Sequence, residues 1–448
     1  MGLFCLVFLI PTSYIYEIVD LLTFFIKYNC TCLGGFKLRY FYIFMLLFLV
    51  VEQGWAKTSK TKDENILDVA IMVHGPARSE FFRIFKTFTK KSKIEIHHRA
   101  YDDSAYKEMI NKWLLNGENS PDVIYWQSGA RLHSYIPYGH VKDITALWQQ
   151  QNFDRYFSQT QDLVQLENKY YAVPFSYYPW GLYYVQKFSD ENGGVAKTWD
   201  QLLSQCRSLR KMDRYFSAIP LKEHWPVAAW FDYLNLRING LKFHHELLKG
   251  SISFTDARVR SVFEHWAQLQ KAECFMPKTK KSNWRDILPY LYRKKIAYVL
   301  MGNFVMGYFP DSIREDINFV SFPKIKEIPR YEEAPTDVFL ISNKTKKEKQ
   351  ALEFLKFIAN AETQSLLASG LKQFPVNKES HLISSSQFDE RALKHLSTSA
   401  GMSQYFDRDT SQFFAPEALK ILAKFAVDAN MDNAMQRLEA LRLKIFKK

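Results

Sequence analysis

Cysteine is scarce in this chain, with 5 among 448 residues, and three of the five lie within the first 56. Only Cys206 and Cys274 remain beyond that point, where they either pair or stay as buried free thiols. Neither belongs to a Cys-x-x-Cys pair or to a cluster with histidine. The sequence therefore argues against a structural zinc site, and we expect no metal or other cofactor.

Catalytic signatures are absent as well. The chain has no Gly-x-Ser-x-Gly elbow, no Walker loop, no His-Glu-x-x-His and no Gly-x-Gly-x-x-Gly. The adjacent pairs His97-His98 and His244-His245 cannot jointly face a metal, because neighbours on a strand or helix point in different directions. We therefore do not expect an enzyme.

Acidic residues are outnumbered by basic ones, 47 against 60, and the formal net charge is +13. With 47% hydrophobic and 24% charged residues the composition is globular, which excludes disorder and collagen-like repeats. The lysines are spread along the chain without a nucleic-acid-binding motif, in runs near residues 57–62, 278–281, 344–349 and 444–448. We interpret the charge as surface charge and expect no nucleic-acid partner.

The first 56 residues predict a secretory signal peptide. A basic patch at Lys37–Arg39 precedes an apolar stretch from Tyr40 to Val51, and Gly54–Ala56 supplies small residues before a cleavage point. This stretch is shorter than the roughly 20 residues that span a bilayer, although an uncleaved anchor is the alternative. Because a signal peptide rarely has so long a segment ahead of its basic patch, we expect translation to begin near Leu33–Lys37, with Met1–Thr31 an over-extension.

The remaining chain alternates between strand and helix patterns. A strand at Leu67–Val73, an amphipathic helix rich in phenylalanine, a strand at Ile94–Ile96, a helix at Tyr106–Asn116 and a strand at Pro121–Tyr125 follow one another. This order predicts a mostly parallel α/β sheet. Further strands are predicted near residues 173, 296–301, 319–323 and 338–341, and helices at 198–211, 227–237, 256–272, 347–368 and from 416 onward. The pattern predicts two α/β lobes with several chain crossings.

Aromatic residues form 16% of the chain and gather at predicted strand ends and in loops that contain Gly and Pro. In open α/β sheets ligands bind beyond the carboxyl ends of strands. Aromatic faces stack on the C–H faces of sugar rings, while polar side chains bind the hydroxyls. The candidates for such a site are Trp126, Tyr177, Tyr178, Trp180, Trp225, Trp230, Asn303 and Phe304. For any single tryptophan, packing in the core is an equal alternative.

Taken in order, these segments resemble the periplasmic carbohydrate-binding proteins of ABC importers, the extracellular solute-binding family that includes maltose-binding protein. The similarity spans residues 66–448 and is carried by Pro121–Trp126, Tyr171–Tyr184, Lys197–Leu203, Met301–Phe304, Pro335–Asp337, Phe354–Ile358 and Phe374–Asn377.

The resemblance implies an α/β, two-lobed periplasmic-binding-protein (Venus-flytrap) fold with interleaved lobes and multiple hinge crossings. These crossings would fall near residues 172–175, 319–322 and 340–343. After the signal peptide (1–56) and a linker (57–65), lobe 1 would comprise 66–172 and 319–342, and lobe 2 would comprise 173–318 and 343–448. The protein would be a periplasmic monomer that captures a sugar or oligosaccharide in the interlobe cleft and delivers it to the membrane permease of an ABC importer.

The resemblance also implies roles for single residues. Trp126 would stack on the sugar with Arg131 as a nearby polar contact, and Glu223 with Trp225 would form a carboxylate–aromatic pair in the second lobe. Phe304 matches the family's aromatic after Gly-Asn, and Asp337 would lie near the hinge. The loop around Arg78 departs from the family, because it offers a cation where aromatic and acidic residues are often seen, and this hints at an anionic sugar.

Two other functions stay open from the sequence. A sugar-sensing protein coupled to a membrane receptor kinase or cyclase would use the same fold. A periplasmic carbohydrate-active enzyme would need two carboxylates about 5–10 Å apart across the cleft, and Glu223 with Asp337 is the only pair that we could nominate.

From the sequence alone, we expect the ligand to be an oligosaccharide, and an acidic one. Trp126→Ala should weaken its binding by about 1–3 kcal/mol, because an aromatic side chain buries a large area on a ligand. Ligand-induced quenching of tryptophan fluorescence is the measurement. Unchanged affinity would remove Trp126 from the site.

Overall fold

The computed structural model describes residues 65–73, 77–277, 279, 281–383 and 387–446. The predicted signal peptide and all but one residue of the predicted linker lie outside the described residues, as do His74–Pro76 of the loop before Arg78. Asn65–Lys448 forms one compact unit. None of the helices described in it combines the length and the apolar character that crossing a membrane requires.

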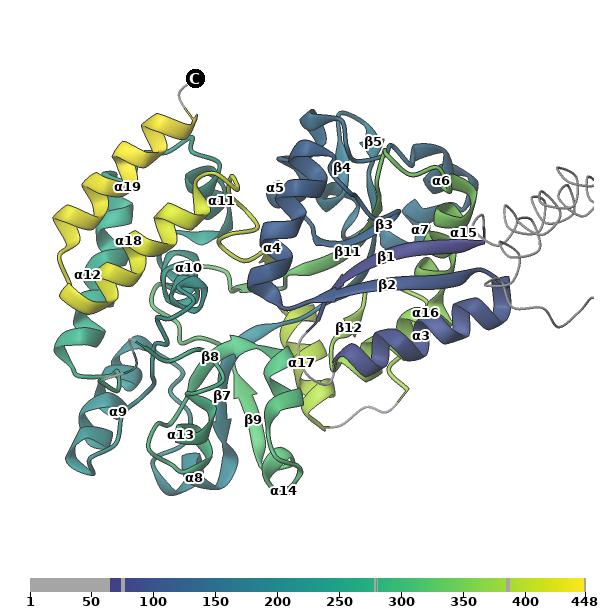
Figure 1. Ribbon diagram of the computed structural model, residues 1–448. Helices are drawn as coiled ribbons and strands as arrows, with labels where there is room; N and C mark the ends of the chain where they lie inside the picture. Colours follow the sequence, from purple (N-terminus) through teal and green to yellow (C-terminus); the bar gives the residue numbers. More distant parts are fainter. Residues whose placement is uncertain (1–64, 74–76, 278, 280, 384–386, 447–448) are drawn as a thin grey trace, which may run out of the picture. The chain divides into compact units, whose positions relative to one another are not determined.

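A six-stranded sheet carries the first part of the fold (Figure 1). Its strands, in spatial order, are β12 (Phe374–Pro375), β6 (Ala172–Tyr177), β11 (Thr336–Ile341), β3 (Val123–Gln127), β1 (Ile66–Met72) and β2 (Glu95–Tyr101). β1 pairs in parallel with β2 and β3, as the strand–helix alternation predicted. β11 runs antiparallel to both β3 and β6, and β12 runs antiparallel to β6. β1, β2, β3 and β6 therefore all run in one direction, as a mostly parallel sheet requires, whereas β11 and β12 run against them and make the sheet mixed.

Amphipathic helices cover this sheet. α3 (Ala77–Ser92) buries Phe81, Phe85 and Phe88 and lies beside α16 (Ala361–Leu371). The single helix predicted over 347–368 is wrong, since the structure has α15 (Glu348–Ala359) followed by α16. Asn360 has an extended backbone and accepts hydrogen bonds from the amides of Glu362 and Thr363, so it ends one helix and caps the next.

The other elements around the first sheet are short. They are α4 (Asp103–Asn111) with a π-helical turn (Lys112–Asn116), α5 (Ala130–His133), α6 (Thr145–Gln150), α7 (Phe153–Phe157) and the hairpin β4 (Gln165–Leu166) and β5 (Lys169–Tyr170).

A three-stranded antiparallel sheet carries the second part. β7 (Trp180–Val185) is its central strand, between β8 (Val299–Gly302) and β9 (Ile317–Val320). A two-stranded parallel sheet pairs β10 (Tyr331–Glu333) with β13 (Gly401–Ser403). The helices are α8 (Gln186–Glu191), α9 (Trp199–Lys211), α10 (Ala228–Ile238), α11 (Gly240–Leu248), α12 (Ala257–Lys271), α13 (Leu288–Tyr292), α14 (Asp311–Arg314), α17 (Gln387–Ser397), α18 (Ala415–Asp428) and α19 (Met431–Phe446).

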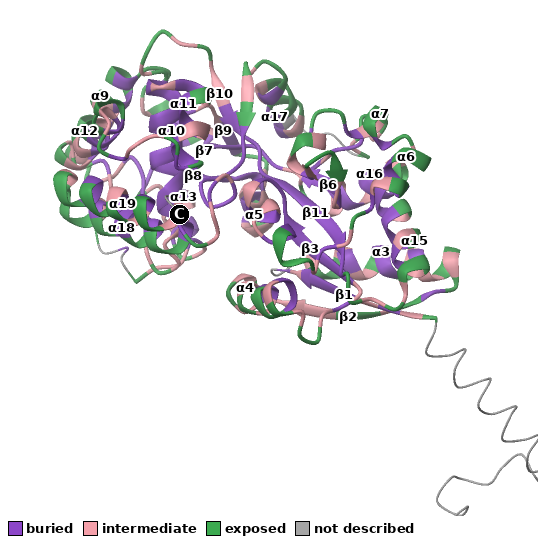
Figure 2. Ribbon diagram, turned by 90° about the horizontal axis from the view of Figure 1, so that it is seen from above, coloured by how far each residue is buried: buried purple, intermediate pink, exposed green. Residues whose placement is uncertain are grey.

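Two hydrophobic cores follow from this arrangement, as the buried strands in Figure 2 indicate. The first core joins the six-stranded sheet to α3 and α15, and the second joins β7–β9 to α10, α12, α18 and α19. Phe354, Leu355 and Leu367 pack in the first core, although the predicted boundaries put residues from 343 onward in lobe 2. In contrast, β9 pairs with β7 although residues from 319 were expected in lobe 1. We keep the division into lobes as a proposal, amended at these two places.

Cys206 and Cys274 form a disulfide, which resolves the alternative that the sequence left open. Cys206 lies on α9 and Cys274 follows α12, and both are fully buried in the second core. The bond joins residues 68 positions apart, so it restricts the unfolded chain over a long loop.

Replacing both cysteines by alanine should lower the free energy of unfolding by about 2–4 kcal/mol, because the unfolded chain regains the freedom that the crosslink removes. Denaturant unfolding of the variant and of the oxidised chain measures this difference. The reduced wild-type chain is the control and should resemble the variant. Equal stability of all three would show that the crosslink does not stabilise the fold.

Candidate functional site

A cavity of about 370 Å³ lies where the two cores meet. Met72, Phe81 and Tyr125 come to its lining from the first core, and Trp180 and Tyr405 come from the second. Its other lining residues are Ala77, Asp103, Lys107, Gln127, Tyr178, Glu223, Trp225, Trp284, Phe304, Gly307, Tyr308, Arg314, Asp337, Gly370, Leu371, Lys372, Gln373, Asp407 and Arg408. The cavity therefore combines aromatic and charged side chains from segments far apart in the sequence.

The second core supplies an aromatic wall, which we define as Trp180, Trp225, Trp284, Phe304 and Tyr405. The ring of Trp180 stacks on Tyr405 with centroids 4.4 Å apart. Trp225 meets each of the other four rings edge-on or steeply inclined, at centroid distances of 6.0–6.4 Å. Because neighbouring rings hold one another in place, this wall is an ordered apolar surface.

The local sequence places the wall's residues. Trp180 opens β7, and Gly302 ends β8 directly opposite it. A Cβ atom on Gly302 would lie 2.7 Å from Phe304 Cε1 and 3.0 Å from Trp180 Nε1. Only glycine at position 302 therefore lets the rings of Phe304 and Trp180 lie this close to the backbone. Trp225 begins a 3₁₀ turn whose second residue is Pro226, and Glu223 Oε2 accepts a hydrogen bond of 3.3 Å from the Trp284 amide.

The floor of the cavity is a hydrogen-bonded group of four side chains, Arg408, Asp337, Tyr125 and Tyr178. Arg408 Nη1 donates to Asp337 Oδ1 at 2.8 Å, and Arg408 also donates to the Tyr178 hydroxyl. The Tyr125 hydroxyl donates to Asp337 Oδ2 at 2.6 Å. Burial raises the pKa of Asp337 while Arg408 lowers it, and burial raises the pKa of both tyrosines. Both phenols are therefore neutral donors at physiological pH.

Arg408 belongs to an irregular, mostly buried stretch that follows β13, Gln404–Thr410, which we call the connecting segment. Gln404 Oε1 accepts from the Thr336 amide at 2.8 Å, and Asp407 Oδ2 accepts from Arg131 Nη1 at 3.0 Å. Both of these contacts reach the first sheet or the helix after it. On the other side, the amide of Phe406 donates to Asp232 Oδ2 on α10. The connecting segment thus contacts both cores and places Tyr405, Asp407 and Arg408 in the cavity lining.

A buried carboxyl pair lies behind the connecting segment. Burial raises the pKa of Asp232 and of Glu333 well above their ordinary values, and each carboxyl lies close enough to affect the other. No hydrogen-bond donor among the described residues reaches Asp232 Oδ1 or either carboxyl oxygen of Glu333. Two buried carboxylates without a donor would repel each other, so we expect the pair to keep a proton.

The neighbouring Glu332 has the opposite environment. It accepts from Arg237 Nη2 at 2.7 Å and from Arg330 Nη1 at 2.8 Å, and His395 Nε2 lies 3.1 Å away. Burial alone would raise the pKa of Glu332, but these three groups outweigh burial and lower it to about 2. The pKa values of these two adjacent residues therefore shift in opposite directions, because their side chains point to opposite sides of the strand and meet different partners.

The structure brings six of the twelve predicted site residues together in the cavity lining. They are Tyr178, Trp180, Glu223, Trp225, Phe304 and Asp337. Glu223 and Asp337, the carboxyl pair considered for catalysis, both line the cavity. Arg408 and Tyr125 each donate to one oxygen of Asp337, which leaves the second lone pair of each oxygen to accept a hydrogen bond from a ligand.

Trp126 does not line the cavity. It is 1% exposed and its ring stacks on Tyr106 at a centroid distance of 6.1 Å. Successive residues of a strand point to opposite faces, so β3 sends Tyr125 and Gln127 into the cavity and Trp126 to the other side. The prediction selected the right strand and a residue one position away from those that line the cavity.

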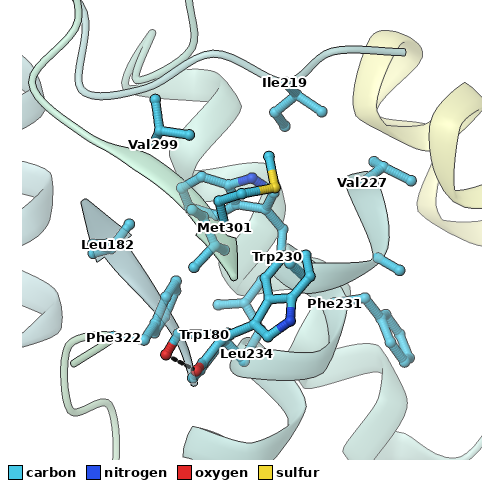
Figure 3. Close-up of a cluster of buried hydrophobic side chains, with 14 of the residues drawn as sticks. Trp180, Leu182, Ile219, Val227, Trp230, Phe231, Leu234, Val299, Met301 and Phe322 are labelled. Atoms are coloured by element: carbon cyan, nitrogen blue, oxygen red, sulfur yellow. Dashed lines mark hydrogen bonds between the residues drawn. The ribbon is translucent and has the colours of Figure 1, made fainter. Parts of the chain in front are cut away.

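The other five predicted residues also lie outside the lining. Arg131 is buried under Trp126 and pairs with Asp407, which does line the cavity. Arg78 is exposed, with its guanidinium carbon 5.4 Å from the centre of the Phe82 ring. Trp230 packs within the second core, near Met301 and Leu234 in Figure 3. Tyr177 packs against Phe374, and Asn303 donates to the Lys372 carbonyl.

The sequence reasoning missed most of the polar lining, and above all Tyr405, Asp407 and Arg408. A run of aromatic and charged residues without a helical period, between Gly401 and Pro416, was the available signal. Within the residues that the structure describes, no group of three or more His, Cys, Asp or Glu side chains is placed to hold a metal ion.

A family model for bacterial extracellular solute-binding proteins matches residues 78–365, and the chain belongs to this family. Membership implies an extracytoplasmic location. Two proteins of Pyrococcus horikoshii, each named an uncharacterized ABC transporter extracellular-binding protein, are similar in sequence. One is 22% identical over 354 residues, covering 76% of this chain and 79% of the relative. The other is 23% identical over 310 residues, covering 67% and 70%.

Solved structures show the same two-lobed fold. The bacterial solute receptor AcbH superposes with a TM-score of 0.81 at 22% identity, covering 85% of this chain and 99% of that chain. A protein studied for xylan utilization by Caldanaerobius polysaccharolyticus gives 0.77 at 19% identity, with 85% and 100% covered. A chitin oligosaccharide binding protein gives 0.76 at 15% identity, with 85% and 99% covered. The α/β two-lobed fold inferred from the sequence is confirmed.

The carboxyl pair predicts a specific pH dependence of stability. The folded chain keeps a proton that the unfolded chain loses near pH 4, so this contribution is complete below pH 4 and is lost as the pH rises through the folded pKa. Asp232→Asn combined with Glu333→Gln removes both carboxyls, and their amides can still hydrogen-bond to each other. From about pH 5 up to the folded pKa, the double variant's free energy of unfolding should therefore fall less steeply than that of the wild type, by up to about 1.4 kcal/mol per pH unit.

Urea unfolding at several pH values measures the slope. Glu417→Gln is the matched control, because Glu417 is a half-exposed carboxylate on α18 and should leave the slope unchanged. A wild-type slope in the double variant would show that the pair does not hold a proton.

Proposed function

We propose that the protein captures a sugar in the cavity between its two cores and delivers it to the membrane permease of an ABC importer. The observation that carries this proposal is the pairing of the aromatic wall with a hydrogen-bonded polar floor in one cavity. A sugar ring has apolar C–H faces and a rim of hydroxyls, so it needs both kinds of surface at once. A volume of about 370 Å³ is near the lower end for ligand sites and suits a short sugar.

The ligands of similar structures support a sugar. AcbH is described as having an exclusive preference for β-D-galactopyranose, and another neighbour is a chitin oligosaccharide binding protein. Further neighbours were solved with maltose and with raffinose, at TM-scores of 0.71 and 0.70. The names of both Pyrococcus relatives favour an ABC transporter over a sensory receptor as the partner. The binding role of this family favours capture over catalysis.

The ligand that we favour is uncharged. The sequence suggested an anionic sugar because Arg78 offered a cation, but Arg78 is absent from the cavity lining and lies over Phe82. The lining contains four acidic residues (Asp103, Glu223, Asp337 and Asp407) and four basic residues (Lys107, Arg314, Lys372 and Arg408), so its formal charges cancel.

The location and the working state complete the proposal. We expect the signal peptide over residues 1–56 to direct export to the periplasm, and the mature chain to act as a monomer. Closure of the lobes over the sugar would be driven by the ligand's higher affinity for the closed state.

The proposal is tested by titrating the purified mature chain, residues 57–448, with neutral mono- and disaccharides while following tryptophan fluorescence. At least one sugar should change the fluorescence saturably. Trp225→Ala should weaken that binding about tenfold to hundredfold, since a large half-buried ring leaves the wall and about 1–3 kcal/mol of contact is lost.

Tyr138→Ala is the matched control, because Tyr138 is 44% exposed and lies outside the cavity lining. It should bind the same sugar as tightly as the wild type. Absence of sugar binding to the wild type would contradict the proposed function, and unchanged affinity in Trp225→Ala would remove the aromatic wall from the site.

A further inference from the structure

Two buried ion pairs lie at the cavity, and the first of them belongs to its floor. Arg408 pairs with Asp337 at 2.8 Å, and their side chains are 5% and 2% exposed. Arg131 pairs with Asp407 at 3.0 Å, and both side chains are also buried. Three of these four residues line the cavity directly, and Arg131 lies behind Asp407. The floor therefore contains buried charges of both signs that neutralise each other.

The pair Arg408–Asp337 is held from several sides. Both oxygens of Asp337 have a donor, Arg408 on one and the Tyr125 hydroxyl on the other. Arg408 in turn donates to the Thr336 carbonyl and to the Tyr178 hydroxyl. Because the surroundings fix both partners, a ligand meets the two charges in a preset geometry.

This geometry treats ligands differently according to their charge. An anionic group near the floor would be repelled by Asp337, and it could engage Arg408 fully only by displacing that carboxylate. The displaced carboxylate would then be a buried charge without its partner, which is strongly unfavourable. A cationic ligand would meet the same difficulty with Arg408. Hydroxyl groups avoid both costs, since they can donate to Asp337 and accept from the Tyr178 hydroxyl, whose hydrogen is not used by Arg408, without breaking the ion pair.

We propose that the Arg408–Asp337 ion pair determines the charge selectivity of the cavity, so that it admits uncharged sugars and rejects the matching sugar acids. Asp337 is a contact residue in this scheme, and Arg408 is a positioning residue that holds Asp337 in place and neutralises it. The inference rests on the proposed function, because it assumes that sugars are the ligands, and it adds which sugars are excluded and by which two residues.

The test compares matched ligands that differ in one group, glucose with glucuronate and galactose with galacturonate, by isothermal titration calorimetry at pH 7. The wild type should bind at least one neutral member, and the matching acid at least tenfold more weakly. Asp337→Asn keeps the shape of the side chain and leaves Arg408 as an unpaired cation. The ratio of acid to neutral affinity should therefore rise at least tenfold in this variant, while the neutral sugar itself binds more weakly.

Two further variants separate selectivity from structural support. Asp213→Asn also removes one negative charge, from an exposed position with a left-handed backbone that asparagine tolerates, and should leave the ratio unchanged. Arg408→Lys keeps the positive charge and should retain the neutral preference of the wild type. If Asp337→Asn fails to fold, the ratio of acid to neutral affinity in the wild type and in Arg408→Lys still tests the inference. Both proteins must bind the neutral sugar more tightly than the acid.

The outcomes distinguish this inference from the proposed function. A wild type that binds no member of either pair and no other sugar overturns both. A wild type that binds the acid as tightly as the neutral sugar overturns the inference alone. The same holds if Asp337→Asn weakens both members equally, because the ion pair would then only support the fold.

Discussion

The pairing of β11 inside the six-stranded sheet is the constraint on which the rest of the structure depends. This strand lies between β3 and β6, so residues 336–341 sit beside strands that come more than 150 positions earlier in the chain. The intervening chain must leave the sheet after β6 and return before β11, and on its way it builds most of the second core, which α18 and α19 complete from beyond β11. The same pairing sets Asp337 opposite Gln127 and within hydrogen-bonding distance of Tyr125. The strand order therefore brings the polar side chains of the cavity to the place where the two cores meet.

Burial of charge at this junction imposes the second constraint. Ionised groups removed from water need a partner of opposite charge or a proton. The connecting segment supplies such partners, since Arg408 pairs with Asp337 and Asp407 pairs with Arg131. Asp232 and Glu333 satisfy the requirement differently, because burial raises the pKa of each well above its ordinary value and so favours the protonated form. These contacts tie the first sheet to α10, so the polar floor of the cavity also links the two cores.

Much of the local structure could be predicted from the sequence. Periodic apolar residues identified α3, α9, α10 and α12 within a few positions, and Thr198 with Gln201 forms the capping box that begins α9. The site was harder. Trp126 was nominated in place of its neighbours Tyr125 and Gln127, because a segment that is buried on both faces does not reveal which face meets the cavity. Arg408 was missed because its importance comes from residues 71 and 230 positions away.

The sequence by itself determined the α/β alternation and the family, since these depend on periodicity and on short ordered motifs. It also supplied the aromatic residues from which a sugar site could be built. The tertiary structure decided which of them meet, whether Cys206 and Cys274 pair, and how the charges of the cavity cancel. The physical reason is that periodicity tells which face of an element is apolar, whereas contacts between distant segments depend on how the elements pack and on which partners buried charges find there.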